Sequence, residues 1–139
     1  MSERGPRAAW YIDSSIALRI LLGHSRTAVE WFDAQAEAGS ALISSRLLEL
    51  EMTRVLRREG LGVTAAEAFT AELTLLRVDD ALLREAAAIR PHVKSLDALH
   101  LASAQRIGPG HVTVVTHDAA MARVADTLGF DVFDPAAEH

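Results

Sequence analysis

Short hydrophobic runs alternate along the chain with longer stretches in which hydrophobic residues recur at helical spacing. The short runs are typical of buried strands; they cover residues 9–12, 41–43, 112–115 and 130–133. The longer stretches predict helices that end at glycine, proline or polar residues; they cover residues 16–22, 27–38, 47–59, 64–76, 81–89, 96–107 and 119–128. Because strands and helices alternate, the pattern predicts an α/β fold with a short parallel sheet and helices on both faces.

The stretch KSLDALHLASAQ, residues 94–105, is the most unusual of the predicted helices. It starts at Ser95, a good N-cap residue, and is apolar almost all round, as expected of a buried helix. Asp97 nevertheless lies in its first turn. A buried carboxylate must be paired, hydrogen-bonded or metal-bound, although attraction to the helix dipole would also explain Asp97. His100 follows on nearly the same face, where it could bond Asp97, reach a substrate or find a partner in the core.

Two further aspartates stand where predicted strands end. Asp13 follows the first strand and Asp118 the strand at residues 112–115, and each also opens a helix that it could cap. The carboxyl ends of parallel strands share one edge of a sheet, which is where α/β proteins bind ligands. We therefore expect Asp13 and Asp118 to be neighbours, with Asp97 near them.

A glutamate on the helix at residues 47–59 is the fourth candidate. Glu51 and Glu49 lie at opposite borders of its apolar face, so either could point toward the same site. Glu51 precedes Arg54 by three residues and Arg58 by seven, and a solvated ion pair is the simpler use of such spacing.

The candidate side chains all offer oxygen atoms. Carboxylates that lie close together raise one another's pKa unless a cation neutralises them. Oxygen ligands suit a hard divalent cation, Mg²⁺ or Mn²⁺, whereas zinc would favour cysteine or an HExxH motif, and the chain has neither. A carboxylate-held Mg²⁺ suits hydrolysis of phosphodiester bonds.

Composition adds several limits. The 139 residues suggest one domain at residues 9–134, with a flexible N-terminal tail at 1–8 and a C-terminal tail at 135–139. The absence of cysteine excludes disulfides, and we expect a soluble, cytoplasmic protein without signal peptide or membrane association. The net charge of −5 argues against a nucleic-acid partner, except that a cation-binding cluster would account for most of the excess.

Four blocks in order resemble the PIN domain and, within it, the VapC-type toxin ribonucleases of bacterial toxin–antitoxin pairs. The blocks span residues 11–130; they are YIDSSIAL, SSRLLELEMTRVLRR, SLDALHLASA and VVTHDAAMARVADTLGF. The resemblance implies a three-layer α/β/α fold. It places the catalytic acids at Asp13, Glu51, Asp97 and Asp118, and Glu51 is preferred to Glu49 because EMTRVLRR fits the family's glutamate-then-arginine helix better.

The resemblance also implies the roles of these residues. The three aspartates would hold Mg²⁺ or Mn²⁺, with Glu51 holding a second metal or orienting the attacking water. Further expected site residues, supporting or contacting RNA, are Thr116, Ser14, Arg54 and Arg58. The implied activity is an endoribonuclease acting on single-stranded or structured RNA, such as transfer or ribosomal RNA. The implied assembly is a homodimer neutralised by a cognate VapB-type antitoxin.

Other readings compete with this one. A haloacid-dehalogenase-like phosphatase needs a second aspartate where Ser15 stands, and a receiver domain needs a lysine after a late strand, whereas Lys94 precedes a helix. The non-enzymatic alternative is a PIN-like binding module whose acids serve structure or partner contact. It predicts no binding of divalent metal and a gain in stability when an acid is neutralised.

Overall fold

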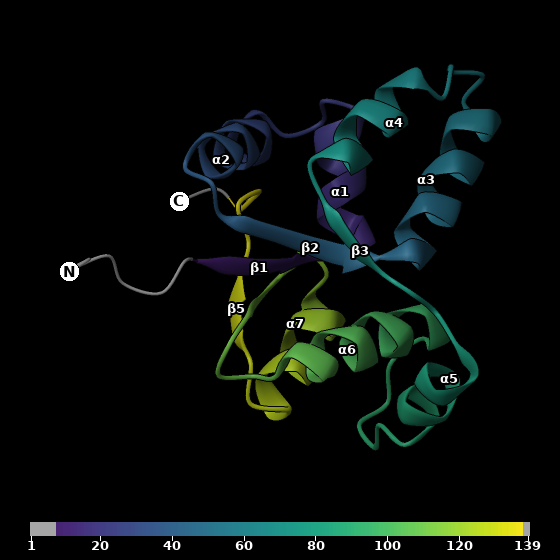
Figure 1. Ribbon diagram of the computed structural model, residues 1–139, viewed down its shortest axis with the longest axis vertical. Helices are drawn as coiled ribbons and strands as arrows, with labels where there is room; N and C mark the ends of the chain where they lie inside the picture. Colours follow the sequence, from purple (N-terminus) through teal and green to yellow (C-terminus); the bar gives the residue numbers. More distant parts are fainter. Residues whose placement is uncertain (1–7, 138–139) are drawn as a thin grey trace.

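The computed structural model describes residues 8–137 and is organised around a parallel sheet (Figure 1). Its five strands stand in the order β3-β2-β1-β4-β5. Their bounds are Ala9–Ile12 (β1), Ala41–Ser45 (β2), Thr74–Leu76 (β3), Thr113–Val115 (β4) and Asp131–Phe133 (β5). Every neighbouring pair of strands is parallel, which confirms the predicted α/β class.

Helices cover both faces of this sheet, so the fold has the three expected layers (Figure 1). One layer contains α1 (Ser14–Leu21), α2 (Arg26–Glu37), α3 (Arg46–Arg58) and α4 (Thr64–Ala71). The other contains α5 (Asp80–Ala87), α6 (Ser95–Ile107) and α7 (Ala119–Thr127). Within residues 8–137, no helix has both the length and the hydrophobicity needed to cross a bilayer.

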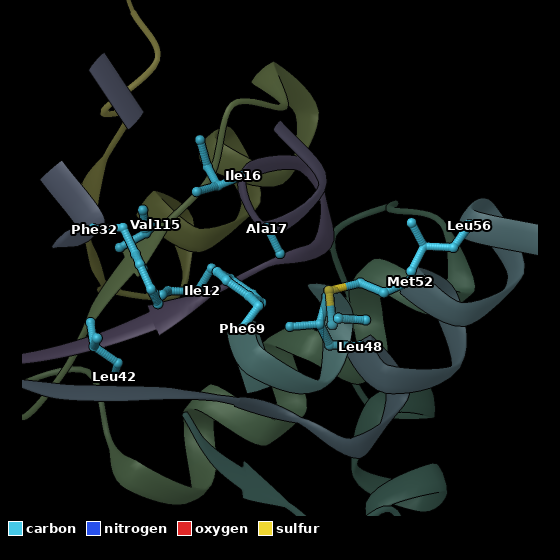
Figure 2. Packing of buried hydrophobic residues seen from close by; sticks show 11 residues of the cluster. Ile12, Ile16, Ala17, Phe32, Leu42, Leu48, Met52, Leu56, Phe69 and Val115 are labelled. Atoms are coloured by element: carbon cyan, nitrogen blue, oxygen red, sulfur yellow. The ribbon is translucent and has the colours of Figure 1, made fainter. Parts of the chain in front are cut away.

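The core consists mainly of two clusters, one on each face of the sheet. Side chains of successive strand residues point to opposite faces. Accordingly, Ile12 and Val115 pack with the first layer, in the cluster that also contains Leu48 (Figure 2), while Tyr11 and Val114 pack with the second. Burial on both faces explains why the strands appear in the sequence as short, continuous apolar runs.

One predicted element is wrong. The helix expected at residues 64–76 ends at Ala71, and the chain then forms the edge strand β3 beside β2, with Leu75 opposite Ser44. Three residues are too few to show a period of two, and β3 exists because β2 offers it backbone partners. The predicted N-cap at Ser95 is also wrong, because Ser95 is the first residue of α6 and no side chain caps that helix.

An ion-pair cluster fixes α6 against α5. The guanidinium of Arg106 lies 2.8 Å from a Glu85 carboxylate oxygen and 2.9 Å from one of Asp79, and Asp79 also caps α5 by accepting from Leu82 N at 2.8 Å. Hydrogen bonds from Arg106 hold the pKa of both carboxyls below their ordinary values. The cluster positions α6, the helix that carries Asp97 and His100.

The predicted tails fall largely outside the described part of the chain. Residues 1–7 and 138–139 are not described, so the expected domain limits of 9–134 stay a prediction.

Candidate active site

The carboxyl edge of the sheet opens into a pocket of about 340 Å³ that we call the acidic pocket. All four predicted acids line it, and they come from four separate segments of the chain. Its lining residues are Asp13, Ser14, Ser15, Leu18, Glu51, Lys94, Ser95, Leu96, Asp97 and Asp118. The parallel sheet therefore gathers the acids as the edge rule predicts.

Asp13 is the most buried of these acids, with 1% of its surface exposed. One carboxylate oxygen, Oδ1, accepts from Ser15 Oγ at 2.7 Å and from Ile16 N at 3.2 Å, while Oδ2 accepts from Thr116 Oγ1. Asp13 thus caps α1 and lines the acidic pocket at once. Burial raises the pKa of the Asp13 carboxyl, although these hydrogen bonds oppose the rise.

Thr116, predicted as a supporting residue, links two of the acids. Besides donating to Asp13, its hydroxyl accepts from the backbone N–H of Asp118 at 3.0 Å. Asp118 in turn caps α7 by accepting from Met121 N at 2.8 Å. A single buried hydroxyl therefore fixes the end of β4 relative to the end of β1.

The neighbouring serines have different positions. Ser14 lines the acidic pocket, and its supporting role stays a prediction. Ser15 makes the connecting bonds: it donates to Asp13, accepts from His117 N at 2.9 Å and lies 3.2 Å from Thr116 Oγ1. Sequence reasoning missed Ser15, although a serine two residues after an aspartate that starts a helix is placed to bond it locally.

Asp97 is partly buried in the first turn of α6. Burial raises the pKa of its carboxyl, and the negative charges of Asp118 and Asp13 raise it further. The electrostatic coupling shows that the three aspartates share one region of negative potential. A cation placed there would relieve that repulsion.

Glu51, and not Glu49, faces the acidic pocket. Glu51 has a side chain 18% exposed, with Oε1 2.9 Å from His100 Nε2. Glu49 instead pairs with Arg46 at 2.9 Å and lines a separate groove between α3 and α4. The expected ion pair of Glu51 with an arginine is thus replaced by a contact with a buried histidine.

The two predicted RNA-contacting arginines lie apart from the pocket lining. Arg54 and Arg58 are exposed on α3, and Arg58 lies 3.2 Å from Glu59 in a surface ion pair. Their predicted contact with RNA stays a prediction.

The acids of the acidic pocket offer oxygen donors to a divalent cation. In residues 8–137 no group of three or more histidine, aspartate or glutamate side chains is already arranged to hold a metal. The chemistry nevertheless fits a hard cation, because the pocket brings together four carboxylates. Burial raises the pKa of both Asp13 and Asp97, and repulsion from Asp118 and Asp13 raises that of Asp97 further.

Replacing Thr116 by valine should lower the free energy of unfolding by about 1–3 kcal/mol, since the isosteric change leaves Oδ2 of the buried Asp13 carboxylate without its hydrogen-bond donor. Urea denaturation followed by circular dichroism would measure this loss. Thr127→Val is the matched control at an exposed site, expected to change stability by less than about 0.5 kcal/mol. Equal stability of the two variants would contradict the role given to Thr116.

The raised pKa of Asp97 predicts that, without metal, Asp97→Asn gains stability relative to the wild type as the pH rises, whether the pocket is catalytic or only a binding module. A carboxyl whose pKa is higher in the folded state favours folding at low pH and opposes it as the pH rises through the folded pKa. In EDTA, the unfolding free energy of the variant minus that of the wild type should therefore increase between about pH 4 and pH 8. Asp79 and Glu85, whose pKa values are lowered, make the protein more stable as the pH rises. This contribution is the same in both proteins, so it cancels in the difference. A difference that is constant or falls with pH would contradict the prediction.

Comparisons with known proteins show which family this chain resembles. The family model of the PIN domain matches residues 10–127. The chain is 33% identical over 131 residues to Ribonuclease VapC46 of Mycobacterium tuberculosis, covering 93% of this chain and 99% of that protein. It is 30% identical over 132 residues to Ribonuclease VapC47 of the same species, covering 91% and 97%.

Two solved structures share the fold at low sequence identity. VapBC2 from Rickettsia felis, bound to a DNA fragment from its promoter, superposes with a TM-score of 0.70 at 12% identity, covering 91% of this chain and 98% of that one. FitAB bound to the IR36 DNA fragment gives 0.69 at 18% identity, covering 93% and 96%. The chain belongs to the PIN-domain family, in its VapC-type branch.

Proposed function

We propose that this protein is a metal-dependent endoribonuclease that acts in the cytoplasm as the toxin of a toxin–antitoxin pair. The observation that carries the proposal is the acidic pocket, in which Asp13, Glu51, Asp97 and Asp118 meet at the carboxyl edge of the sheet. The relatives VapC46 and VapC47 are named ribonucleases, and each aligns with nearly the whole of this chain. Hydrolysis of RNA is the reaction that both the family and the acids support.

The three aspartates would hold Mg²⁺ or Mn²⁺. When bound, the cation would polarise the scissile phosphate and lower the pKa of a water molecule. Glu51 lines the α3 side of the pocket, and its proposed role is to orient that water or to receive its proton. Thr116 and Ser15 keep Asp13 in position, and Ser14 lines the same pocket.

The substrate strand needs cationic groups, because four carboxylates repel phosphate. Lys94 lines the acidic pocket, and Arg54 and Arg58 lie exposed on the same helix as Glu51. We assign all three to contacts with the RNA backbone, whose phosphates are bound by such side chains.

The proposed partners are a VapB-type antitoxin and a second copy of the chain. Support for the antitoxin comes from the fold shared with VapBC2 and FitAB, each solved in complex with DNA. The alternative, a non-catalytic PIN-like module, would use the same acids for structure or partner contact. Binding of divalent cations separates the two possibilities.

Cleavage of a mixed RNA pool by the purified, antitoxin-free protein tests the proposal. We expect cuts with Mg²⁺ or Mn²⁺, none with EDTA, and loss of the cuts in Glu51→Gln. Glu49→Gln is the matched control, because it makes the same change on the same helix but outside the acidic pocket. Cleavage that persists in EDTA, or in Glu51→Gln at the wild-type rate, would refute the proposed chemistry.

A further inference from the structure

A buried hydrogen-bonded chain of three side chains ends at the acidic pocket. The hydroxyl of Tyr11 on β1 lies 2.8 Å from Nδ1 of His100 on α6, and His100 Nε2 lies 2.9 Å from Oε1 of Glu51 on α3. Tyr11 and His100 have no exposed surface, whereas Glu51 is partly exposed in the acidic pocket. These three hydrogen-bonded side chains therefore connect the two helical layers through the sheet.

The donor and the acceptor of each of these two hydrogen bonds can be assigned. An ionised Glu51 carboxylate can only accept, so the proton must be on His100 Nε2. In a neutral imidazole the other nitrogen, Nδ1, is then an acceptor, and the Tyr11 hydroxyl donates to it. A tyrosine hydroxyl has an ordinary pKa of about 10, so it carries the proton needed for this bond at neutral pH. Every buried side-chain polar atom among the described residues has a partner, as this assignment requires.

We propose that His100 is a positioning residue that, by donating its Nε2 proton to Glu51, holds the Glu51 carboxylate toward the acidic pocket. The inference rests on the proposed function, because it gives Glu51 a role in the reaction. A glutamate has three rotatable side-chain bonds, and Arg54 and Arg58 on the same helix offer exposed alternatives. The rigid, fully buried imidazole removes that freedom by fixing one carboxylate oxygen.

A merely structural histidine would satisfy Tyr11 without affecting the reaction. The structural role and the positioning role can be distinguished by replacing His100 with asparagine or glutamine, whose side-chain amides differ in length. The amide nitrogen of glutamine reaches about as far as Nε2 and can donate to Glu51. The amide of asparagine reaches only about as far as Nδ1, so it can meet Tyr11 but not Glu51.

Ring nitrogen chemical shifts of ¹⁵N-histidine-labelled protein test the assignment without any RNA. The wild type should show a neutral His100 ring with its proton on Nε2. Tyr11→Phe should shift the Nδ1 resonance and leave the Nε2 proton in place. A proton on Nδ1, or on both nitrogens, in the wild type would overturn the proposal.

Steady-state cleavage tests the positioning role. His100→Asn should lower kcat by about 10–100-fold with KM nearly unchanged, the usual size of losses when a supporting residue is removed, and His100→Gln should recover most of that loss. His92→Gln, at an exposed histidine, is the matched control and should behave as the wild type. Equal activity of the Asn and Gln variants would overturn the proposal, as would losses that follow thermal stability alone. A wild type that cleaves no RNA would refute the proposed function, and the NMR assignment would then be judged separately.

Discussion

Replacing Asp97 by asparagine should reduce RNA cleavage by at least about a hundredfold and leave the fold intact. The substitution keeps the shape of the side chain but removes a negative charge from the region shared with Asp118 and Asp13. Charge stabilisation by a bound cation contributes several kcal/mol to such reactions, and each factor of ten in rate corresponds to about 1.4 kcal/mol. Single-turnover cleavage with saturating Mn²⁺ would measure the loss.

The matched control for this variant is Asp126→Asn, which makes the same change at an exposed position of α7. It should cleave RNA at the wild-type rate. Circular dichroism of both variants would establish that they are folded. A folded Asp97→Asn protein that cleaves RNA as fast as the wild type would refute the role of the pocket.

Replacing Leu48 by alanine should lower the free energy of unfolding by about 2–5 kcal/mol. Leu48 is fully buried in α3, within the cluster that contains Met52 and Phe69 (Figure 2). Its removal leaves a cavity that the surrounding helices and sheet fill only in part. Urea denaturation monitored by circular dichroism is the appropriate measurement.

Leu50→Ala provides the comparison, because Leu50 lies on the same helix with 58% of its surface exposed. It should change stability by no more than about 0.5 kcal/mol. Similar losses in the two variants would show that the packing of α3 does not depend on this cluster. Glu51 lies three residues beyond Leu48 on α3. RNA cleavage by the Leu48→Ala protein would therefore also show whether the acidic pocket tolerates movement of this helix.

The sheet could be predicted because its central strands are buried on both faces. Continuous apolar runs mark β1, β2 and β4, and the rule that parallel strands share a carboxyl edge then brings Asp13 and Asp118 together. The edge strand β3 could not be predicted in this way. Thr74 is exposed, and Leu75 and Leu76 are only partly buried. The strand is defined by pairing with β2, in which Leu75 lies opposite Ser44, 31 residues earlier in the chain.

The choice between Glu49 and Glu51 could not be made from helical periodicity, because both border the apolar face of α3. The resemblance to known blocks favoured Glu51, and the structure places it in the acidic pocket. The contact that holds Glu51 was not predictable at all. It joins residues 49 positions apart, and the contact between Tyr11 and His100 spans 89, so both depend on how the layers pack.

Titration of Mn²⁺ into the antitoxin-free protein is the most direct test of the proposed cation site, because it needs no knowledge of the RNA substrate. The loss of the free Mn²⁺ signal in electron paramagnetic resonance would measure binding. We expect saturable binding by the wild type and by Glu49→Gln, with affinity that increases as the carboxylates lose their protons. Asp97→Asn should bind at least about tenfold more weakly. Equal binding by Asp97→Asn and the wild type, or no binding by any of them, would contradict a metal-dependent active site in the acidic pocket.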